Sequence, residues 1–168
     1  MPLLTKWKTT SDFQPILDKV QNQVRVWQSK LISQAGRLTL IKSVLSLLTY
    51  CPMQTTILPS GITTKIDQVI CGFLLGNTSE QRHLHIVGWD TLTQSKMHGG
   101  LGIRKTKEND EAFLMNQAWW IWSNLSSLLA KFINHKYCHT FSFLQTHFVI
   151  GSHAWRAILR GRNLLQNC

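Results

Sequence analysis

Regularly spaced apolar residues are the feature of this 168-residue sequence that most restricts its fold. Within residues 11–33 they recur three, four or seven positions apart, which places them on one face of an α-helix. The members of this stripe are Phe13, Ile16, Leu17, Val20, Val24, Trp27 and Leu31. The same spacing recurs over residues 33–50 and 62–74, and Gly76 is a suitable helix end. We therefore predict a mainly α protein, a bundle of about four to five helices.

Two more helices are predicted in the C-terminal part of the chain. Asn109 can cap a long helix that reaches Lys136, because Asp110 and Glu111 would then lie near its positive end. Ser152 can cap a short amphipathic helix, with Gly161 as its predicted end.

The segment between these helical parts has a different composition. Residues 77–107 are rich in Asn, Thr, Ser, His and Gly, and only residues 85–89 are a candidate for a short extended piece. We therefore expect three regions, which are a helical region 1–76, an irregular Gly/His-rich connecting loop 77–107, and a helical region 108–168.

The charge balance favours a polyanionic partner. Eighteen Lys and Arg against eight Asp and Glu give a net charge of +10, and no carboxylate follows Glu111. Nucleic acid and an acidic membrane surface both fit such a charge, as does a basic surface with no specific partner. The most membrane-like segment, residues 113–133, contains Asn116, Gln117 and Asn124, which argues for a buried helix. No membrane partner is therefore expected.

The four cysteines are dispersed, which is typical of a reducing compartment and favours an intracellular location, nuclear or cytoplasmic.

No catalytic or metal site is predicted. A two-metal nuclease or polymerase site needs carboxylates that converge, and the adjacent ones, Glu108 to Glu111, stand where a helix start normally has them. Zinc requires four ligands, usually in two pairs. A second pair of ligands is missing for both candidate sets, which are His135, Cys138 and His139, and His83 and His85.

The sequence MHGGLGIRK, residues 97–105, is the strongest candidate for a phosphate loop. It lacks the spacing of a P-loop and the third glycine of a dinucleotide fingerprint, where Lys105 stands. We expect a structural turn at Gly99, Gly100 and Gly102 instead, because glycine permits positive φ and close backbone approach. Arg104 and Lys105 would project from this turn toward phosphate.

The order of the motifs resembles one family. Residues 27–45, WQSKLISQAGRLTLIKSVL, are similar to W-x-x-K-x-L-S-x-A-G-R-x-x-L-I-x-x-V-L of plant LINE-type (non-LTR) retrotransposon reverse transcriptases. The segments 73–76 (FLLG), 85–89 (HIVGW), 99–104 (GGLGIR) and 152–155 (SHAW) follow in the order of that family's later motifs. Together they cover nearly the whole chain.

The resemblance implies the thumb and connection region of that polymerase. The paired-aspartate palm that binds Mg²⁺ would lie upstream, and a zinc-binding and RNase H-like segment would follow, so no cofactor and no activity are expected in this chain alone. In that family the thumb holds the RNA–DNA duplex. The resemblance therefore implies sequence-independent but weak binding of an RNA–DNA hybrid or RNA, because Asn116 and Trp120 replace frequent Lys and Arg.

The candidate nucleic-acid-binding residues are the cations within the matching motifs. They are Arg37, Lys42, Lys96, Arg104 and Lys105. An alternative for Arg37 and Lys42 is that they only flank a buried helix. An alternative for the whole chain is a small basic helical protein-interaction module without enzymatic activity, which would associate through exposed apolar helix faces such as residues 113–133.

Overall fold

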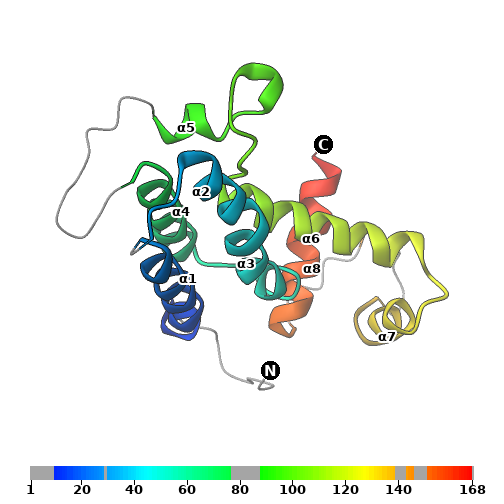
Figure 1. Ribbon diagram of the computed structural model, residues 1–168. Coiled ribbons are helices and arrows are strands. Elements are labelled where there is room, and N and C mark those ends of the chain that lie inside the picture. Colours follow the sequence, from blue (N-terminus) through cyan, green and yellow to red (C-terminus); the bar gives the residue numbers. More distant parts are fainter. Residues whose placement is uncertain (1–9, 29, 77–87, 139–142, 146–150, 168) are drawn as a thin grey trace. The chain divides into compact units, whose positions relative to one another are not determined.

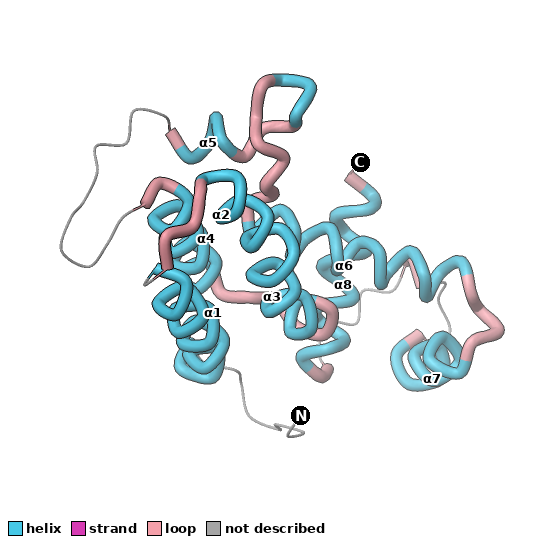
Figure 2. The backbone as a smooth tube through the Cα atoms, viewed as in Figure 1, coloured by secondary structure: helices cyan, strands magenta, loops and turns pink. Residues whose placement is uncertain are grey.

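Helices form most of the part of the chain that its computed structural model describes, which comprises residues 10–28, 30–76, 88–138, 143–145 and 151–167 (Figure 1). Figure 2 shows helices and loops but no strand in these ranges. The predicted mainly α class is therefore confirmed. The helices are α1 (Gln14–Gln28), α2 (Gln34–Leu40), α3 (Ser46–Met53), α4 (Ser60–Leu74), α5 (Trp89–Leu92), α6 (Thr106–Ser123), α7 (Leu128–Tyr137) and α8 (His153–Gln166).

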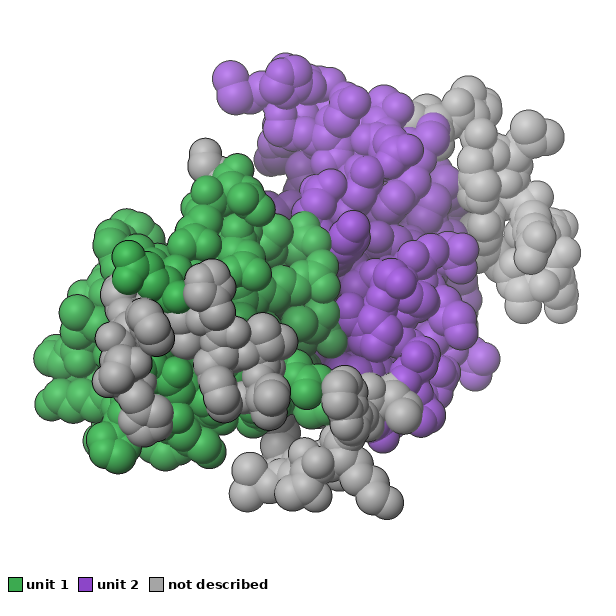
Figure 3. All heavy atoms as spheres, turned by 180° about the vertical axis from the view of Figure 1, so that it is seen from behind, with its two compact units in different colours: residues 1–8, 53–57, 110–168 green, residues 9–52, 58–109 purple. Residues whose placement is uncertain are grey.

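The chain divides into two compact units, which Figure 3 colours separately. Unit 1 takes in residues 1–8, 53–57 and 110–168, and unit 2 takes in residues 9–52 and 58–109. The three regions predicted from the sequence, with borders at residues 76 and 107, were defined by sequence pattern and composition, whereas the two units are defined by contacts in space. The three regions therefore stay a prediction.

The core of unit 2 is built on α1 and α4. The apolar stripe of α1 supplies Leu17 and Val20, both at most 2% exposed, and α4 supplies Ile62 and Ile66 at 0%. At the end of both helices the rings of Trp27 and Phe73 pack with their centroids 5.6 Å apart. The helix predicted for residues 11–33 is shorter than expected, since α1 ends at Gln28 and Leu31 lies fully exposed beyond it.

The second predicted helix is a continuous helical run with an irregular middle. Ser33 caps α2 by accepting a hydrogen bond from the Gly36 amide, and the π-helical segment η2 (Ile41–Leu45) joins α2 to α3. The run continues through Pro52 to Met53, past the predicted end at residue 50. After α4, Gly76 adopts a φ of 78°, as suits a residue that ends a helix.

The core of unit 1 forms around Trp155 of α8. Its ring stacks on Tyr137 with centroids 4.4 Å apart and meets the edge of Phe143 at 6.5 Å. Ile121 of α6 and Ile133 of α7 are buried in the same cluster. The predicted cap is confirmed, because Ser152 Oγ accepts from the Trp155 amide at 3.2 Å. The predicted end at Gly161 is wrong, since α8 continues to Gln166.

The long helix predicted from Asn109 to Lys136 is also wrong at two points. Helix α6 begins three residues earlier, at Thr106, so that Asn109 is inside its first turn and is not its cap. The helix then breaks after Ser123, and Ser127 starts α7 by accepting a hydrogen bond from the Ala130 amide. The polar residues Ser123 to Ser127 compete for backbone hydrogen bonds, which explains the break.

Several predicted features lie outside the described residues. They are the extended piece at 85–87, the histidines at 83, 85 and 139, and the first residues of the chain. Of the expected irregular loop, the described part from Gly88 to Lys105 contains α5 and the short 3₁₀ helix η3 (Lys96–His98).

Candidate nucleic-acid interface

One wall of the candidate site is the helical run of α2, η2 and α3 in unit 2. Lys42, Ser46 and Tyr50 stand four residues apart, so they share one face of this run. The π-helical segment η2 covers residues 41–45, and the Ser46 hydroxyl donates a hydrogen bond to the Ile41 carbonyl at 3.0 Å. Single π-helical turns of this kind are frequently found at functional sites.

The glycine loop forms a second wall. Gly99 and Gly102 adopt φ of 80° and 66°, and a side chain at Gly100 would collide with the carbonyl of Gln94. The loop is closed by backbone hydrogen bonds, with the Gly100 amide donating to Ser95 and the Leu101 amide to Leu92, each at 3.0 Å. The turn therefore has a defined shape that residues with a Cβ cannot reproduce at these three positions.

A lysine connects the two walls. Lys42 Nζ donates to the Leu101 carbonyl at 2.5 Å, although the two residues are 59 positions apart in the sequence. One of the three ammonium donors is used in this way, and two remain. The side chain of Lys96 lies against Gly102 on the same loop.

The start of α6 is held by a carboxylate of α4. Asp67 Oδ1 accepts hydrogen bonds from the Thr106 amide at 3.0 Å and from the Thr106 hydroxyl at 2.5 Å. Burial raises the pKa of Asp67 above its usual value, and the two hydrogen bonds from Thr106 oppose that shift. This contact fixes the first turn of α6, and with it the position of Asn109.

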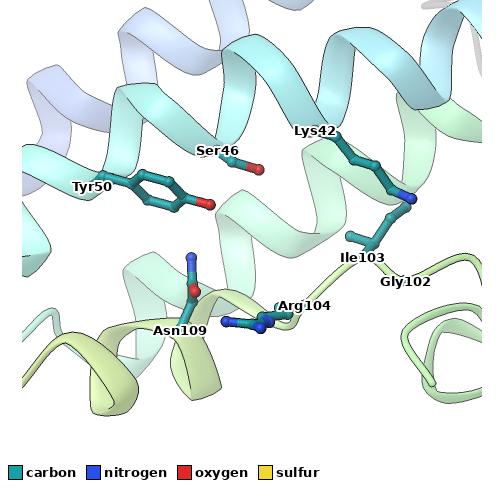
Figure 4. A pocket seen from close by; sticks show the side chains of 7 residues that line it. All are labelled: Lys42, Ser46, Tyr50, Gly102, Ile103, Arg104 and Asn109. Atoms are coloured by element: carbon teal, nitrogen blue, oxygen red, sulfur yellow. The ribbon is translucent and has the colours of Figure 1, made fainter. Parts of the chain in front are cut away.

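These elements enclose a polar pocket of about 170 Å³ within unit 2 (Figure 4). Its lining residues are Lys42, Ser46, Tyr50, Gly102, Ile103, Arg104 and Asn109. Figure 4 shows Ser46 and Tyr50 on one side of the space, and Asn109 and Arg104 on the other. Arg104 is exposed, and its guanidinium has no hydrogen-bond or ion-pair partner among the described residues. The pocket therefore offers positive charge together with neutral polar groups.

The structure separates the five predicted binding cations into two groups. Lys42 and Arg104 both line the pocket, and Lys96 is exposed beside it. Arg37 donates to the Phe73 carbonyl at 3.4 Å and lies 5.9 Å from the centre of the Phe73 ring, so it supports the end of α4. Lys105 pairs with Asp90 at 2.6 Å. Its hydrogen bond to that carboxylate raises the pKa of Lys105.

Sequence reasoning did not select Ser46, Tyr50 or Asn109 as site residues. The spacing of Lys42, Ser46 and Tyr50 was a usable signal, because residues four apart on a helix share a face. Asn109 carried no such signal, since its place in the pocket depends on the contact between Asp67 and Thr106.

Two negative observations concern only the described ranges. There, no three His, Cys, Asp or Glu residues come together in a way that could hold a metal ion. Helices of sufficient length and apolarity to cross a bilayer are likewise absent from those ranges.

Comparison with known proteins gives two plant relatives. The chain is 33% identical over 160 residues to the "Putative ribonuclease H protein At1g65750" of Arabidopsis thaliana. That match covers 95% of this chain and 26% of the relative, so the chain spans about a quarter of that protein's length. No protein-family model and no solved structure matches the chain.

The second relative is a shorter protein, of which two thirds are matched. It is the uncharacterized mitochondrial protein AtMg00310 of Arabidopsis thaliana, 30% identical over 105 residues, which are 60% of this chain and 67% of that protein. The chain belongs to the same family as this mitochondrial protein.

Proposed function

We propose that the chain is the thumb and connection region of a plant non-LTR retrotransposon reverse transcriptase, and that it binds nucleic acid without sequence specificity. The observation that carries this proposal is that Lys42 and Arg104 line the same pocket. Both residues lie in the segments that resemble the family's motifs, yet they are 62 positions apart in the numbering. Phosphate groups of a strand at the pocket would accept from the free donors of these cations.

Three further observations support nucleic acid as the partner. The chain carries a net charge of +10. The first relative has a name that denotes a ribonuclease, which is a protein that acts on RNA. The pocket cations are held by the fold, because Lys42 is fixed by the Leu101 carbonyl and Arg104 follows the glycine turn. The catalytic step of polymerisation is no part of the proposal, because no group of three or more His, Cys, Asp or Glu residues that could hold a metal ion occurs among the described residues.

A titration of the full chain against a fluorescent RNA–DNA hybrid at several salt concentrations tests the proposal. We expect the logarithm of the binding constant to fall linearly with the logarithm of salt, because phosphate contacts release counterions. Arg104→Gln should weaken binding and reduce the steepness of that line by about one contact.

Lys65→Gln is the matched control, because Lys65 is exposed on α4 of the same unit and lies outside the pocket. It should change the affinity less than Arg104→Gln does. Absence of binding at low salt would overturn the proposal, as would an affinity that salt does not change.

A second candidate function is supported by the exposed apolar surface of unit 1. Seven large apolar side chains between residues 119 and 132 are 42–87% exposed. They are Trp119, Trp120, Trp122, Leu125, Leu128, Leu129 and Phe132. Large apolar side chains left exposed in such number are typical of protein association. The candidate function is therefore a protein-interaction module, and static light scattering tests it. A monomer at every concentration that also fails to bind an apolar dye would contradict it.

A further inference from the structure

The hydrogen bonding of the Ser46 hydroxyl group does not suit a site that binds phosphate alone. Its only proton is used in the hydrogen bond to the Ile41 carbonyl, at an Oγ–O distance of 3.0 Å. The oxygen therefore presents lone pairs, and no donor, to the pocket that Ser46 lines. A phosphate diester carries no proton to donate to it, so phosphate leaves this acceptor unsatisfied.

Asn109 extends the same argument on the opposite side of the pocket. Its side-chain amide contains one carbonyl oxygen and one NH₂ group, so it can accept and donate. Figure 4 shows this amide extending toward the space between Tyr50 and Arg104. The pocket thus combines two cations, which provide only donors, with Ser46, which provides an acceptor, and Asn109, which provides both a donor and an acceptor. A matching ligand has an anionic group and a hydroxyl group side by side.

A ribose–phosphate unit has this combination, and a deoxyribose–phosphate unit does not. The 2′-hydroxyl is both a donor and an acceptor, and it is the group by which a protein distinguishes RNA from DNA. The pocket volume of about 170 Å³ corresponds to several water molecules, so there is room for more than one contacting group.

We propose that this pocket binds a ribose–phosphate unit of an RNA strand and selects RNA over DNA. The 2′-hydroxyl donates to Ser46 Oγ and accepts from the Asn109 amide, while Lys42 and Arg104 contact phosphates of the same strand. This inference rests on the proposed nucleic-acid binding and adds to it the identity of the strand. Because one neutral hydrogen bond contributes little net free energy, the selectivity is modest, roughly three- to tenfold in affinity.

The test measures the affinity of the full chain for three single strands of one base sequence, made of RNA, DNA and 2′-fluoro RNA. The fluoro strand keeps the sugar pucker of RNA but has no 2′ donor. We expect RNA to bind tightest and the other two strands to bind alike. If the fluoro strand binds as tightly as RNA, the chain reads the shape of the strand and the proposal for Ser46 is overturned.

Ser46→Ala should lower the affinity for RNA more than the affinity for DNA and so reduce the preference for RNA. The matched control is Ser43→Ala, since the Ser43 hydroxyl donates to the Thr39 carbonyl at 2.8 Å on the same helical run but does not line the pocket. Asn109→Ala is a second variant that should reduce the preference for RNA without altering α3.

The outcomes separate this inference from the proposed function. Equal binding of RNA and DNA by the unaltered chain, with the expected salt dependence, overturns the selectivity and leaves the nucleic-acid binding intact. Failure of all three strands to bind at low salt overturns the selectivity, and failure of the RNA–DNA hybrid as well overturns both. A loss of affinity for RNA and DNA alike in Ser46→Ala also counts against the selectivity.

Discussion

The two units of the chain differ in what they leave exposed to solvent. In unit 2 polar groups in and beside the pocket are held by hydrogen bonds, as Lys42 is by the Leu101 carbonyl and Thr106 is by the Asp67 carboxylate. In unit 1 the residues between 119 and 132 expose tryptophan and leucine side chains, and Asp110 and Glu111 are its only carboxylates. The difference teaches that basic charge alone does not define the candidate nucleic-acid site. A fixed geometry around the cations defines the candidate nucleic-acid site, and the pocket in unit 2 has such a geometry.

The first prediction tests the contrast between buried and exposed tryptophans inside unit 1. Trp155→Ala should have the largest effect of the changes considered, because the ring is 1% exposed and stacks on Tyr137. We expect a loss of about 3–5 kcal/mol in the free energy of unfolding. Urea denaturation followed by far-ultraviolet circular dichroism measures it.

Trp119→Ala is the matched control, since Trp119 is 52% exposed on α6. Its effect on the free energy of unfolding should stay within about 0.5 kcal/mol. Similar losses for the two variants would show that the exposed tryptophans of unit 1 are packed after all, and the comparison between the units would fail.

The glycine turn of unit 2 is the next point to test. Gly100→Ala places a methyl group against the backbone carbonyl of Gln94, which cannot move as a flexible side chain can. We expect a loss of about 1–3 kcal/mol. RNA binding should weaken as well, because Arg104 follows this turn. Thermal unfolding and the anisotropy titration together measure both effects.

Gly61→Ala serves as the control for that change, because a Cβ at Gly61 would have no neighbour within 4 Å. It should be neutral or slightly stabilising, since alanine is the better helix former. If both glycine variants behave alike, the loop has no steric requirement at Gly100.

A smaller effect is expected where α4 holds the start of α6. Asp67→Ala removes the acceptor for the Thr106 amide and hydroxyl, and we expect a loss of about 1 kcal/mol by analogy with other helix caps. Asp90→Ala, which removes the exposed ion pair with Lys105, should cost less. Chemical denaturation of both variants decides the order, and the reverse order would contradict the anchoring role of Asp67.

The smallest expected effect is a pH dependence from the same carboxylate. Burial raises the pKa of Asp67 in the folded protein above its usual value of 3.8, so the folded state holds this proton more tightly than the unfolded state does. Its contribution to stability is therefore present at pH values below 3.8 and is lost as the pH rises through the folded pKa.

Asp67→Asn should remove this contribution. The measurement is the urea midpoint of both proteins at a series of pH values from 3.8 upward. The urea midpoint of the unaltered protein, relative to that of Asp67→Asn, should fall as the pH rises. A difference that does not vary with pH would show that the Thr106 hydrogen bonds offset the burial completely.

Features that depend on neighbours in the sequence were predictable. The apolar stripe of α1, the helix over residues 60–74 and the cap at Ser152 follow from periodicity and from local hydrogen bonds between side chain and backbone. Local reasoning failed where several weak preferences compete. The break between α6 and α7 and the end of α8 are examples, because the apolar period continues across the break and Gly161 does not stop α8.

The sequence by itself determined that this chain is helical and basic, and it indicated which segments carry the motifs. Tertiary structure alone decided which cations share a pocket. Arg37 and Lys42 are five residues apart, yet one supports the end of α4 and the other reaches the Leu101 carbonyl. The physical reason is that helix formation depends on contacts within about four residues, whereas the pocket depends on hydrogen bonds such as those from Thr106 to Asp67 and from Lys42 to Leu101, whose partners are 39 and 59 residues apart.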